Sequence, residues 1–275
     1  MKKLLLFFLI TNVVSSQQIT CSPQDKLAFE DKIIAIKNLG KQDIVAIGKS
    51  FLGTAYVAKT LEIGETETLV VNLHGLDCTT YIENVLAFNL VVKNKKTGFN
   101  DFTKALETIR YKDGKLEGYA SRLHYFTEWI RDNEKKGLVR DITSEIGGKE
   151  ISKTIDFMST HRELYPFLKD SDENYQKIKA TEASLNNESF CVLAPEDIKA
   201  NEHLIQSGDI IALATSINGL DVTHTGIATR EEDGRVHLLH ASTSGEVTVS
   251  EKPLVDYLKG IKKNIGIIVI RVVVE

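Results

Sequence analysis

Cys78 is the residue of this sequence best suited to nucleophilic chemistry. It follows an apolar segment and a glycine turn at residues 71–77 and opens a predicted helix that runs to about residue 92. That helix is predicted because apolar residues recur at helical spacing from Ile82 onward. The first turn of a helix carries free N–H groups and the positive end of the dipole, which favour thiolate over thiol. Cys78 is therefore a candidate nucleophile, and a buried structural thiol is the alternative.

The start of this helix has two candidate caps. Asp77 stands immediately before Cys78, and Thr80 with Glu83 three residues later makes a candidate capping box. Either cap would satisfy free N–H groups of the first turn and fix the point at which the helix begins.

A thiol nucleophile needs a base and a group that orients the base. Among the seven histidines, His224 opens a predicted strand and His240 closes the next one. A hairpin loop of residues 232–234 would place the two histidines diagonally on one face of the sheet, whereas a two-residue turn at 233–234 would place them on opposite faces. In the first register Cys78 attacks, His224 takes its proton and His240 orients the imidazole. The alternative is that each histidine is exposed or bound to a backbone carbonyl.

Cysteine and histidine also bind metals, and His74 and Cys78 are four residues apart. No second close pair of ligands accompanies them, and Gly75 argues against one continuous helix that holds both. A structural zinc site is therefore not expected, and no metal or cofactor is predicted.

The first sixteen residues indicate export. A basic start, a short apolar core and small residues are typical of a secretory signal peptide, and the apolar core is too short to span a membrane. We expect cleavage near Ser16–Gln17, no membrane anchor and a single domain over residues 17–275. Removal of Lys2 and Lys3 takes the formal net charge from −4 to −6. Because no basic patch is concentrated in the sequence, nucleic acid is not an expected partner.

An exported chain with three cysteines has at least one unpaired thiol unless it bridges another chain. Cys21 and Cys191 are the pair that would leave Cys78 free, and three free thiols is the simpler alternative. Sequence spacing does not supply the geometry that a disulfide requires, so both alternatives stay open.

Helices dominate the first part of the chain, and short strands follow. Helices are expected over residues 23–49 with a break near Gly40, over 98–110, around Trp129 and over much of 160–187. This order predicts an α+β fold rather than alternating βαβ units. Strands are expected at residues 68–73, 190–193, 210–214, 224–228, 236–240, 247–249 and 266–274.

Four short motifs follow one another along the chain: Asp77-Cys78, Ser207-Gly208-Asp209-Ile210-Ile211, His224-Thr225-Gly226-Ile227 and Leu239-His240-Ala241-Ser242. In this order they resemble the motifs of the NlpC-type papain-like cell-wall hydrolases. Further runs at residues 52–62, 121–126 and 156–159 resemble the N-acetylmuramoyl-L-alanine amidase branch. The resemblance implies a single papain-like catalytic domain with helical insertions. In that fold N-terminal helices, with the nucleophile helix among them, pack on a C-terminal antiparallel sheet or half-barrel.

The resemblance also implies roles for individual residues. Tyr56 would help the Cys78 N–H to hold an oxyanion, although Ala55 replaces the proline that members more often have before it. Ser121 and Arg122 would contact sugar or stem carboxylates, and loop packing or a surface ion pair is their alternative role. The implied site residues are Cys78, His224 and His240 for catalysis and Tyr56, Asp77, Ser121 and Arg122 for substrate binding.

The implied substrates are peptidoglycan fragments, with the scissile amide joining N-acetylmuramic acid, in its 1,6-anhydro form, to L-alanine. An endopeptidase that cuts between D-glutamate and diaminopimelate would use the same catalytic residues. An inactive periplasmic muropeptide-binding protein on the same scaffold is an alternative of a different class. The joint presence of Cys78, His224 and His240 argues against that last alternative. A periplasmic or secreted protein is expected.

Overall fold

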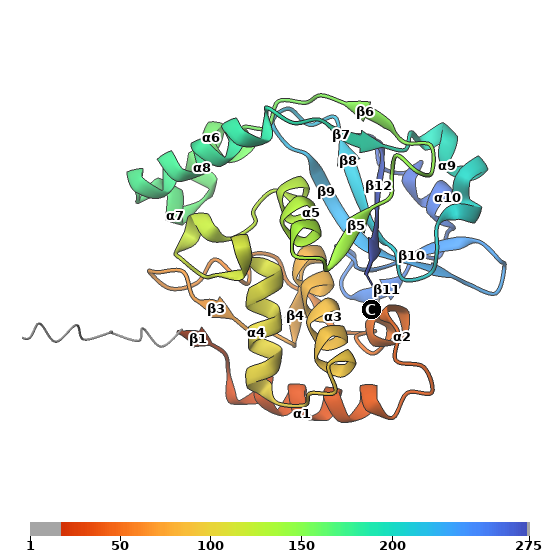
Figure 1. Cartoon of the computed structure of the whole chain (residues 1–275), viewed down its shortest axis with the longest axis horizontal. Coiled ribbons are helices and arrows are strands. Elements are labelled where there is room, and N and C mark those ends of the chain that lie inside the picture. The colour runs from red at the N-terminus through yellow and green to blue at the C-terminus, as the bar shows by residue number, and fades with distance from the viewer. Residues whose placement is uncertain (1–17, 274–275) are drawn as a thin grey trace, which may run out of the picture.

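A six-stranded sheet forms one half of the computed structural model, which describes residues 18–273 (Figure 1). The predicted signal peptide and its cleavage point lie outside the described residues. The strands of this sheet are β5 (Val139–Asp141), β8 (Ile210–Thr215), β9 (Val222–Arg230), β10 (Val236–Ala241), β11 (Val247–Val249) and β12 (Asn264–Val272). Their spatial order is β11-β10-β9-β8-β12-β5, and every neighbouring pair is antiparallel.

Helix α3 (Cys78–Lys93) lies between this sheet and the N-terminal helices (Figure 1). Its neighbours on the helical side are α1 (Pro23–Lys37), α2 (Ile44–Lys49) and α4 (Phe99–Arg110). On the other side α3 packs against β9 and β10. The sequence predicted one apolar face for this helix, but most of α3 is buried, as expected for a helix enclosed on several sides. The nucleophile candidate therefore sits on a rigid central element.

Outside the main sheet, the described residues form three two-stranded pairs. β1 (Ile19–Thr20) pairs with β3 (Leu69–Val70), and β6 (Lys149–Ile151) pairs with β7 (Phe190–Val192). β2 (Ala55–Tyr56) runs parallel to β4 (Gly75–Leu76), which ends immediately before Asp77. The strand expected at 68–73 is thus reduced to β3, and the β2–β4 pair brings Tyr56 to the start of α3.

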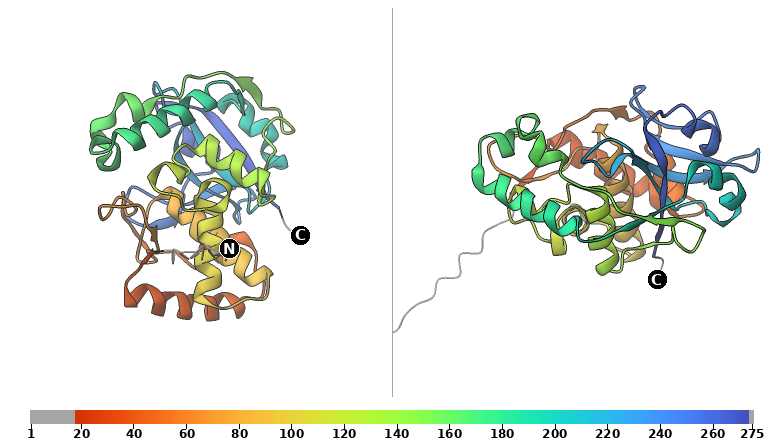
Figure 2. Two further views of the ribbon diagram at one scale, coloured as in Figure 1. Left: turned by 60° about the vertical axis from the view of Figure 1, so that its left-hand side comes forward. Right: turned by 90° about the horizontal axis from the view of Figure 1, so that it is seen from above.

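The remaining helices lie around the sheet. Helices α6 (Phe157–Thr160), α7 (Pro166–Lys169) and α8 (Asp172–Leu185) form a group that projects to one side of it (Figure 2). The Ser171 side chain caps the start of α8. Helix α5 (Phe126–Lys135) contains Trp129, where a helix was expected. Helices α9 (Pro195–Asn201) and α10 (Leu254–Leu258) were not predicted.

The β9–β10 hairpin has the register in which the two histidines share a face. Arg230 pairs with Val236, and the Glu231 N–H donates to the Arg235 carbonyl at 3.1 Å. The loop is therefore residues 232–234, and the two-residue turn is excluded. This register is the one that the catalytic hypothesis requires.

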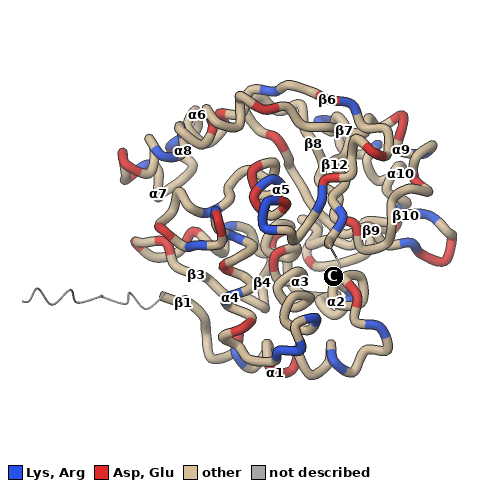
Figure 3. The backbone as a smooth tube through the Cα atoms, in the orientation of Figure 1, with Lys and Arg blue, Asp and Glu red and all other residues tan. Residues whose placement is uncertain are grey.

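All three cysteines are free thiols, so the Cys21–Cys191 pairing is wrong. No helix within residues 18–273 is long and apolar enough to cross a membrane. Basic and acidic residues are interspersed over the described chain (Figure 3). The chain mixes helices with an antiparallel sheet, and its assignment to the papain-like class stays a prediction.

Candidate active site

Cys78 is the first residue of α3, and the cap before it is Asp77. The Asp77 carboxylate accepts from the Thr80 N–H at 2.8 Å, and the Thr80 hydroxyl accepts from the Asp77 N–H at 2.9 Å. This reciprocal pair is a capping box, so the expected Thr80–Glu83 box is wrong. Glu83 instead accepts from Nε of buried Arg110 at 2.6 Å. The cap fixes where α3 begins and therefore where the thiol lies.

The two histidines meet across the hairpin. His224 Nε2 lies 2.6 Å from His240 Nδ1, and the rings are edge to face with centroids 4.8 Å apart. Gly226 permits this approach, because a Cβ at that position would lie 3.0 Å from the His240 Cβ and 2.7 Å from Leu238 Cδ1. The motif His224-Thr225-Gly226 thus supplies the imidazole and the space for its neighbour.

Thr225 joins the histidine strand to the cysteine helix. Its hydroxyl donates to the Cys78 carbonyl at 2.9 Å, and its side chain is 1% exposed. A single buried hydrogen bond of this kind contributes about 1 kcal/mol to stability. Because Thr225 follows His224 directly, the bond also ties the position of the base to that of the nucleophile.

Burial sets the protonation states of the three catalytic candidates. The pKa of Cys78 is raised, first by burial and then by the Asp77 charge, although the Thr225 N–H and hydroxyl act in the opposite direction. Burial, followed by the proximity of His240, lowers the pKa of His224 to about 3. Burial lowers the pKa of His240 to about 4. All these shifts favour a neutral thiol beside neutral imidazoles, opposite in direction to the effect expected from the helix terminus.

Two tyrosines flank the thiol. Tyr56 is half-buried, and its pKa is raised by burial and then by the nearby Cys78 and Asp77 charges. Burial and then Cys78 likewise raise the pKa of Tyr257, whose ring packs edge-on against His240 with centroids 5.4 Å apart. Both phenols are therefore protonated at neutral pH and can donate hydrogen bonds.

A pocket of about 300 Å³ opens beside the first turn of α3. Arg122 is buried in its wall with its guanidinium against Glu62, 3.6 Å from Glu67 and over the Tyr119 ring. The positive charge of Arg122 is thus already balanced by carboxylates of this chain. The pocket is lined by Lys59, Leu61, Glu62, Asp77, Thr79, Glu83, Arg122, Leu123, His124, Leu164 and Tyr165.

Ser121, which was also predicted to bind substrate, forms hydrogen bonds with backbone groups of its own loop. The Ser121 hydroxyl donates to the Gly118 carbonyl at 2.7 Å and accepts from the Glu117 N–H at 2.9 Å, and Ser121 lines a separate hollow. A substrate role for Ser121 stays a prediction. His74 is exposed in the loop before β4. Residues 18–273 contain no group of three or more His, Cys, Asp or Glu side chains placed to hold a metal ion.

Sequence reasoning missed the roles of Thr225 and Tyr257. Thr225 stands inside the histidine motif, but its bond to Cys78 is visible only once the strand and the helix are packed. Tyr257 belongs to α10, a five-residue helix too short to show helical periodicity.

The arrangement of thiol, histidine pair and tyrosines can be compared with known proteins. Residues 46–267 match the model of the AmiA-like family, described as N-acetylmuramoyl-L-alanine amidase-like. A crystal structure of an N-acetylmuramoyl-L-alanine amidase from Bacteroides uniformis is 40% identical, with a TM-score of 0.81, over 85% of this chain and 98% of that chain. No curated protein matches the chain.

Two further solved structures are similar. A Bacteroides fragilis protein named as a candidate xylanase is 40% identical, with a TM-score of 0.78, over 82% of this chain and 99% of that chain. A Legionella pneumophila protein is 22% identical, with a TM-score of 0.69, over 92% of this chain and 95% of that chain, which shows a shared fold alone. Because the family model covers residues 46–267 of the 275, this chain belongs to the AmiA-like, N-acetylmuramoyl-L-alanine amidase-like family.

Proposed function

We propose that this protein is a cysteine-dependent N-acetylmuramoyl-L-alanine amidase with a papain-like, NlpC-type catalytic domain. Its substrates are anhydro-muropeptides, peptidoglycan fragments with a 1,6-anhydro sugar. The observation that carries the proposal is the chain of contacts from Cys78 through Thr225 to the hydrogen-bonded His224–His240 pair. A nucleophile, a base and an orienting group are the three parts that thiol catalysis requires.

The hydrogen bond between His224 and His240 limits where the protons of the pair can lie. In the neutral pair one nitrogen donates and the other accepts. If His224 Nε2–H donates to His240 Nδ1, the Nδ1 of His224 is left unprotonated and can act as a base. His240 thereby holds the tautomer that catalysis needs and stabilises the imidazolium once it forms.

The reaction then proceeds in two halves. The Cys78 sulfur attacks the lactyl carbonyl carbon as His224 takes the thiol proton. His224 gives that proton to the departing amine of L-alanine, the C–N bond breaks and a thioester of the lactyl group remains. Water, deprotonated by His224, attacks the thioester carbon, and the Cys78 thiol leaves with the proton restored. One water molecule is consumed, and the side chains of Cys78 and His224 end in the states in which they began.

The developing oxyanion needs donors that are already in place. The Cys78 N–H at the start of α3 is one donor, and the Tyr56 hydroxyl is the other. The raised pKa of Tyr56 keeps its hydroxyl protonated. Loss of one such donor typically lowers kcat by about a hundredfold or more.

Glycoside hydrolysis, suggested by the name of the Bacteroides fragilis neighbour, is less well supported by the carboxylates near Cys78. A glycosidase of the usual kind needs two carboxyl groups facing the scissile bond. Asp77 caps α3, Glu83 pairs with Arg110, and Glu62 contacts the Arg122 guanidinium. These three carboxylates are already engaged by the protein itself.

We also propose that the protein is exported, because its first sixteen residues are typical of a signal peptide. Mass spectrometry of the mature protein should then give an N-terminus near Gln17. An N-terminus at Met1 in protein recovered outside the cytoplasm would contradict this proposal.

Incubation with a defined anhydro-muropeptide tests the proposed reaction. Mass spectrometry should show free 1,6-anhydro-N-acetylmuramic acid and a peptide stem that begins at L-alanine. Cys78→Ala should leave no more than a trace of both products. The matched control is Cys191→Ala, which removes another half-buried free thiol and should retain full activity.

The alternatives give different products. Cleavage between D-glutamate and diaminopimelate would mean that the protein is an endopeptidase. Saturable binding of the intact muropeptide without cleavage would mean that it is a binding protein. Activity retained in Cys78→Ala would overturn the cysteine mechanism.

A further inference from the structure

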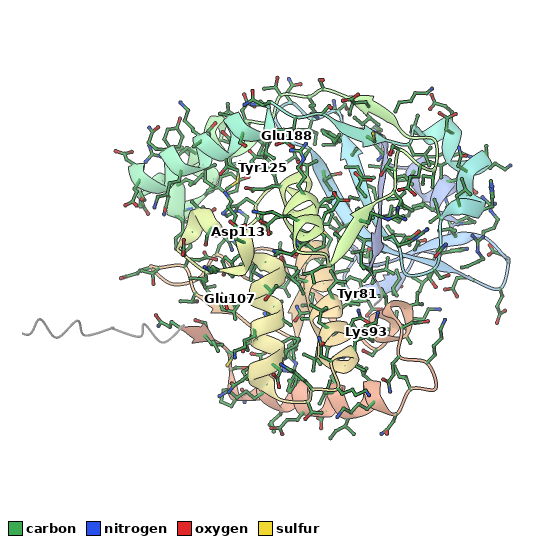
Figure 4. All side chains as sticks on the ribbon, in the orientation of Figure 1. Tyr81, Lys93, Glu107, Asp113, Tyr125 and Glu188 are labelled. Atoms are coloured by element: carbon green, nitrogen blue, oxygen red, sulfur yellow. The ribbon has the colours of Figure 1, made fainter. Side chains whose placement is uncertain are left out.

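A second and larger hollow, of about 600 Å³, lies at the opposite end of α3 from Cys78. Fifteen residues of helix separate Cys78 from Lys93, which places the hollow about 22 Å along the helix axis from the thiol. Figure 4 shows Lys93 at the far end of α3, next to α2. The walls of the hollow are residues 41–44, Asn89, Lys93, Arg140, residues 206–209 and residues 271–273.

Two polar side chains in this wall have no partner among residues 18–273. Asn89 is 1% exposed, and its amide oxygen is enclosed without a hydrogen bond. The Lys93 Nζ is enclosed and unpaired in the same way. The two residues are four apart on α3 and therefore lie on one face of the helix. Enclosed polar groups need hydrogen-bond partners, and the position of these two in the wall of one hollow allows a single ligand to supply both.

The charges of the wall leave one cation unbalanced. Lys93 has no carboxylate partner within residues 18–273, and burial lowers the pKa of its ammonium group. A ligand with one negative charge would balance the single unpaired ammonium group of Lys93. The other three cations are each paired: Lys41 with Asp43 at 2.7 Å, Arg140 with Glu145 at 2.7 Å and Arg271 with Asp209 at 2.8 Å.

The Asn89 oxygen adds a second requirement, because it needs a hydrogen-bond donor. Ile44, Val272 and Val273 add a third, because they give the wall an apolar part. The ligand should therefore combine one carboxylate, an N–H close to it and an apolar side chain. These three features occur together in an N-acylated apolar amino acid, such as the C-terminal residue of a peptide.

We propose that this hollow is a second binding site, separate from the thiol site, for a monoanionic carboxylate of the N-acyl amino acid type. Its carboxylate accepts from the Lys93 Nζ, its amide N–H donates to the Asn89 Oδ1, and its side chain packs on Ile44, Val272 and Val273. The site does not depend on the reaction proposed at Cys78.

Calorimetric titration with N-acetyl-L-leucine at constant ionic strength tests the site. The wild-type protein should bind it saturably, and Lys93→Met should weaken binding at least tenfold. N-acetyl-L-leucinamide, which lacks the charge, and inorganic phosphate, which lacks the apolar side chain, should each bind at least tenfold more weakly than N-acetyl-L-leucine. The matched control is Lys41→Met, which removes a paired and 84% exposed cation from the same wall and should change affinity less than twofold.

Several results would overturn the proposal. Absence of saturable binding to the wild-type protein would do so, as would equal binding of the amide or of phosphate. Equal weakening in Lys41→Met and Lys93→Met would show a general charge effect. Asn89→Asp, which places a carboxylate beside that of the ligand, should also weaken binding. Unchanged melting temperature and muropeptide cleavage in each variant would exclude misfolding as the cause.

Discussion

Acidification should destabilise this protein through His224 and His240 in particular. Their folded pKa values of about 3 and about 4 lie below the ordinary value of 6.5, so the folded state binds fewer protons than the unfolded state. The stability that this difference contributes is present above pH 6.5 and is lost as the pH falls toward the folded values. Between pH 7 and pH 5, protonation of each histidine in the unfolded chain costs about 2 kcal/mol of folding free energy, or about 4 kcal/mol for the pair.

Urea unfolding at pH 7 and pH 5 measures this loss. The magnitude depends little on the folded pKa values as long as both stay well below 5, because the unfolded histidines then supply the whole difference. His240→Gln and His224→Gln should each remove about 2 kcal/mol of the pH 7 to pH 5 loss. His203→Gln, which replaces an exposed histidine, is the matched control. The wild-type protein and the three histidine variants contain the same carboxylates, so the contribution of carboxylates to the stability loss cancels when the four proteins are compared.

If His240→Gln and His224→Gln lost as much stability between pH 7 and pH 5 as the wild-type protein, the buried pair would not be neutral in the folded state. The neutral resting site and the general-base role of His224 would then both be wrong.

Two further predictions concern the elements that hold the site. Thr225→Val removes the hydroxyl that donates a hydrogen bond to the Cys78 carbonyl. We expect urea unfolding to show a stability loss of about 1 kcal/mol, and steady-state kinetics to show a severalfold drop in kcat with little change in KM. Thr225→Ser, which keeps the hydroxyl, should restore both stability and kcat. An unchanged kcat would show that the bond does not position the thiol. Glu83→Gln breaks an ion pair in which both side chains are 2% exposed, and urea unfolding should show a loss of about 3–5 kcal/mol. Glu173→Gln, in an exposed helix pair, should leave stability nearly unchanged, and equal losses would contradict the role of burial.

Local features of the site followed from the sequence because they depend on neighbouring residues. The start of α3 at Cys78 was predicted correctly from helical spacing and from Asp77 as one of two candidate caps. The histidine geometry needed one further fact, the loop length, which allowed two registers with opposite consequences. The pairing of Glu231 with Arg235 decided between them.

Features that depend on distant residues did not follow. Arg122 has the charge to bind a stem carboxylate, but Glu62 and Glu67 reach it from a segment more than fifty residues earlier in the chain. The direction of the Cys78 pKa shift also depends on distant residues. The helix dipole is a local property, whereas burial, the first cause of the raised pKa of Cys78, is set by the whole fold.

The positive end of α3 therefore acts at a different stage from the one that the sequence suggested. In the mechanism proposed above, burial favours the thiol form of Cys78 at rest, and the proton moves to His224 during attack. As the sulfur bonds to the carbonyl carbon, negative charge would develop on the substrate oxygen, close to the Cys78 N–H and the first turn of the helix. There the dipole stabilises an oxyanion that the resting enzyme does not contain. A stabilising interaction made only in the transition state raises kcat, whereas one that also stabilised a resting thiolate would lower the energy of both states.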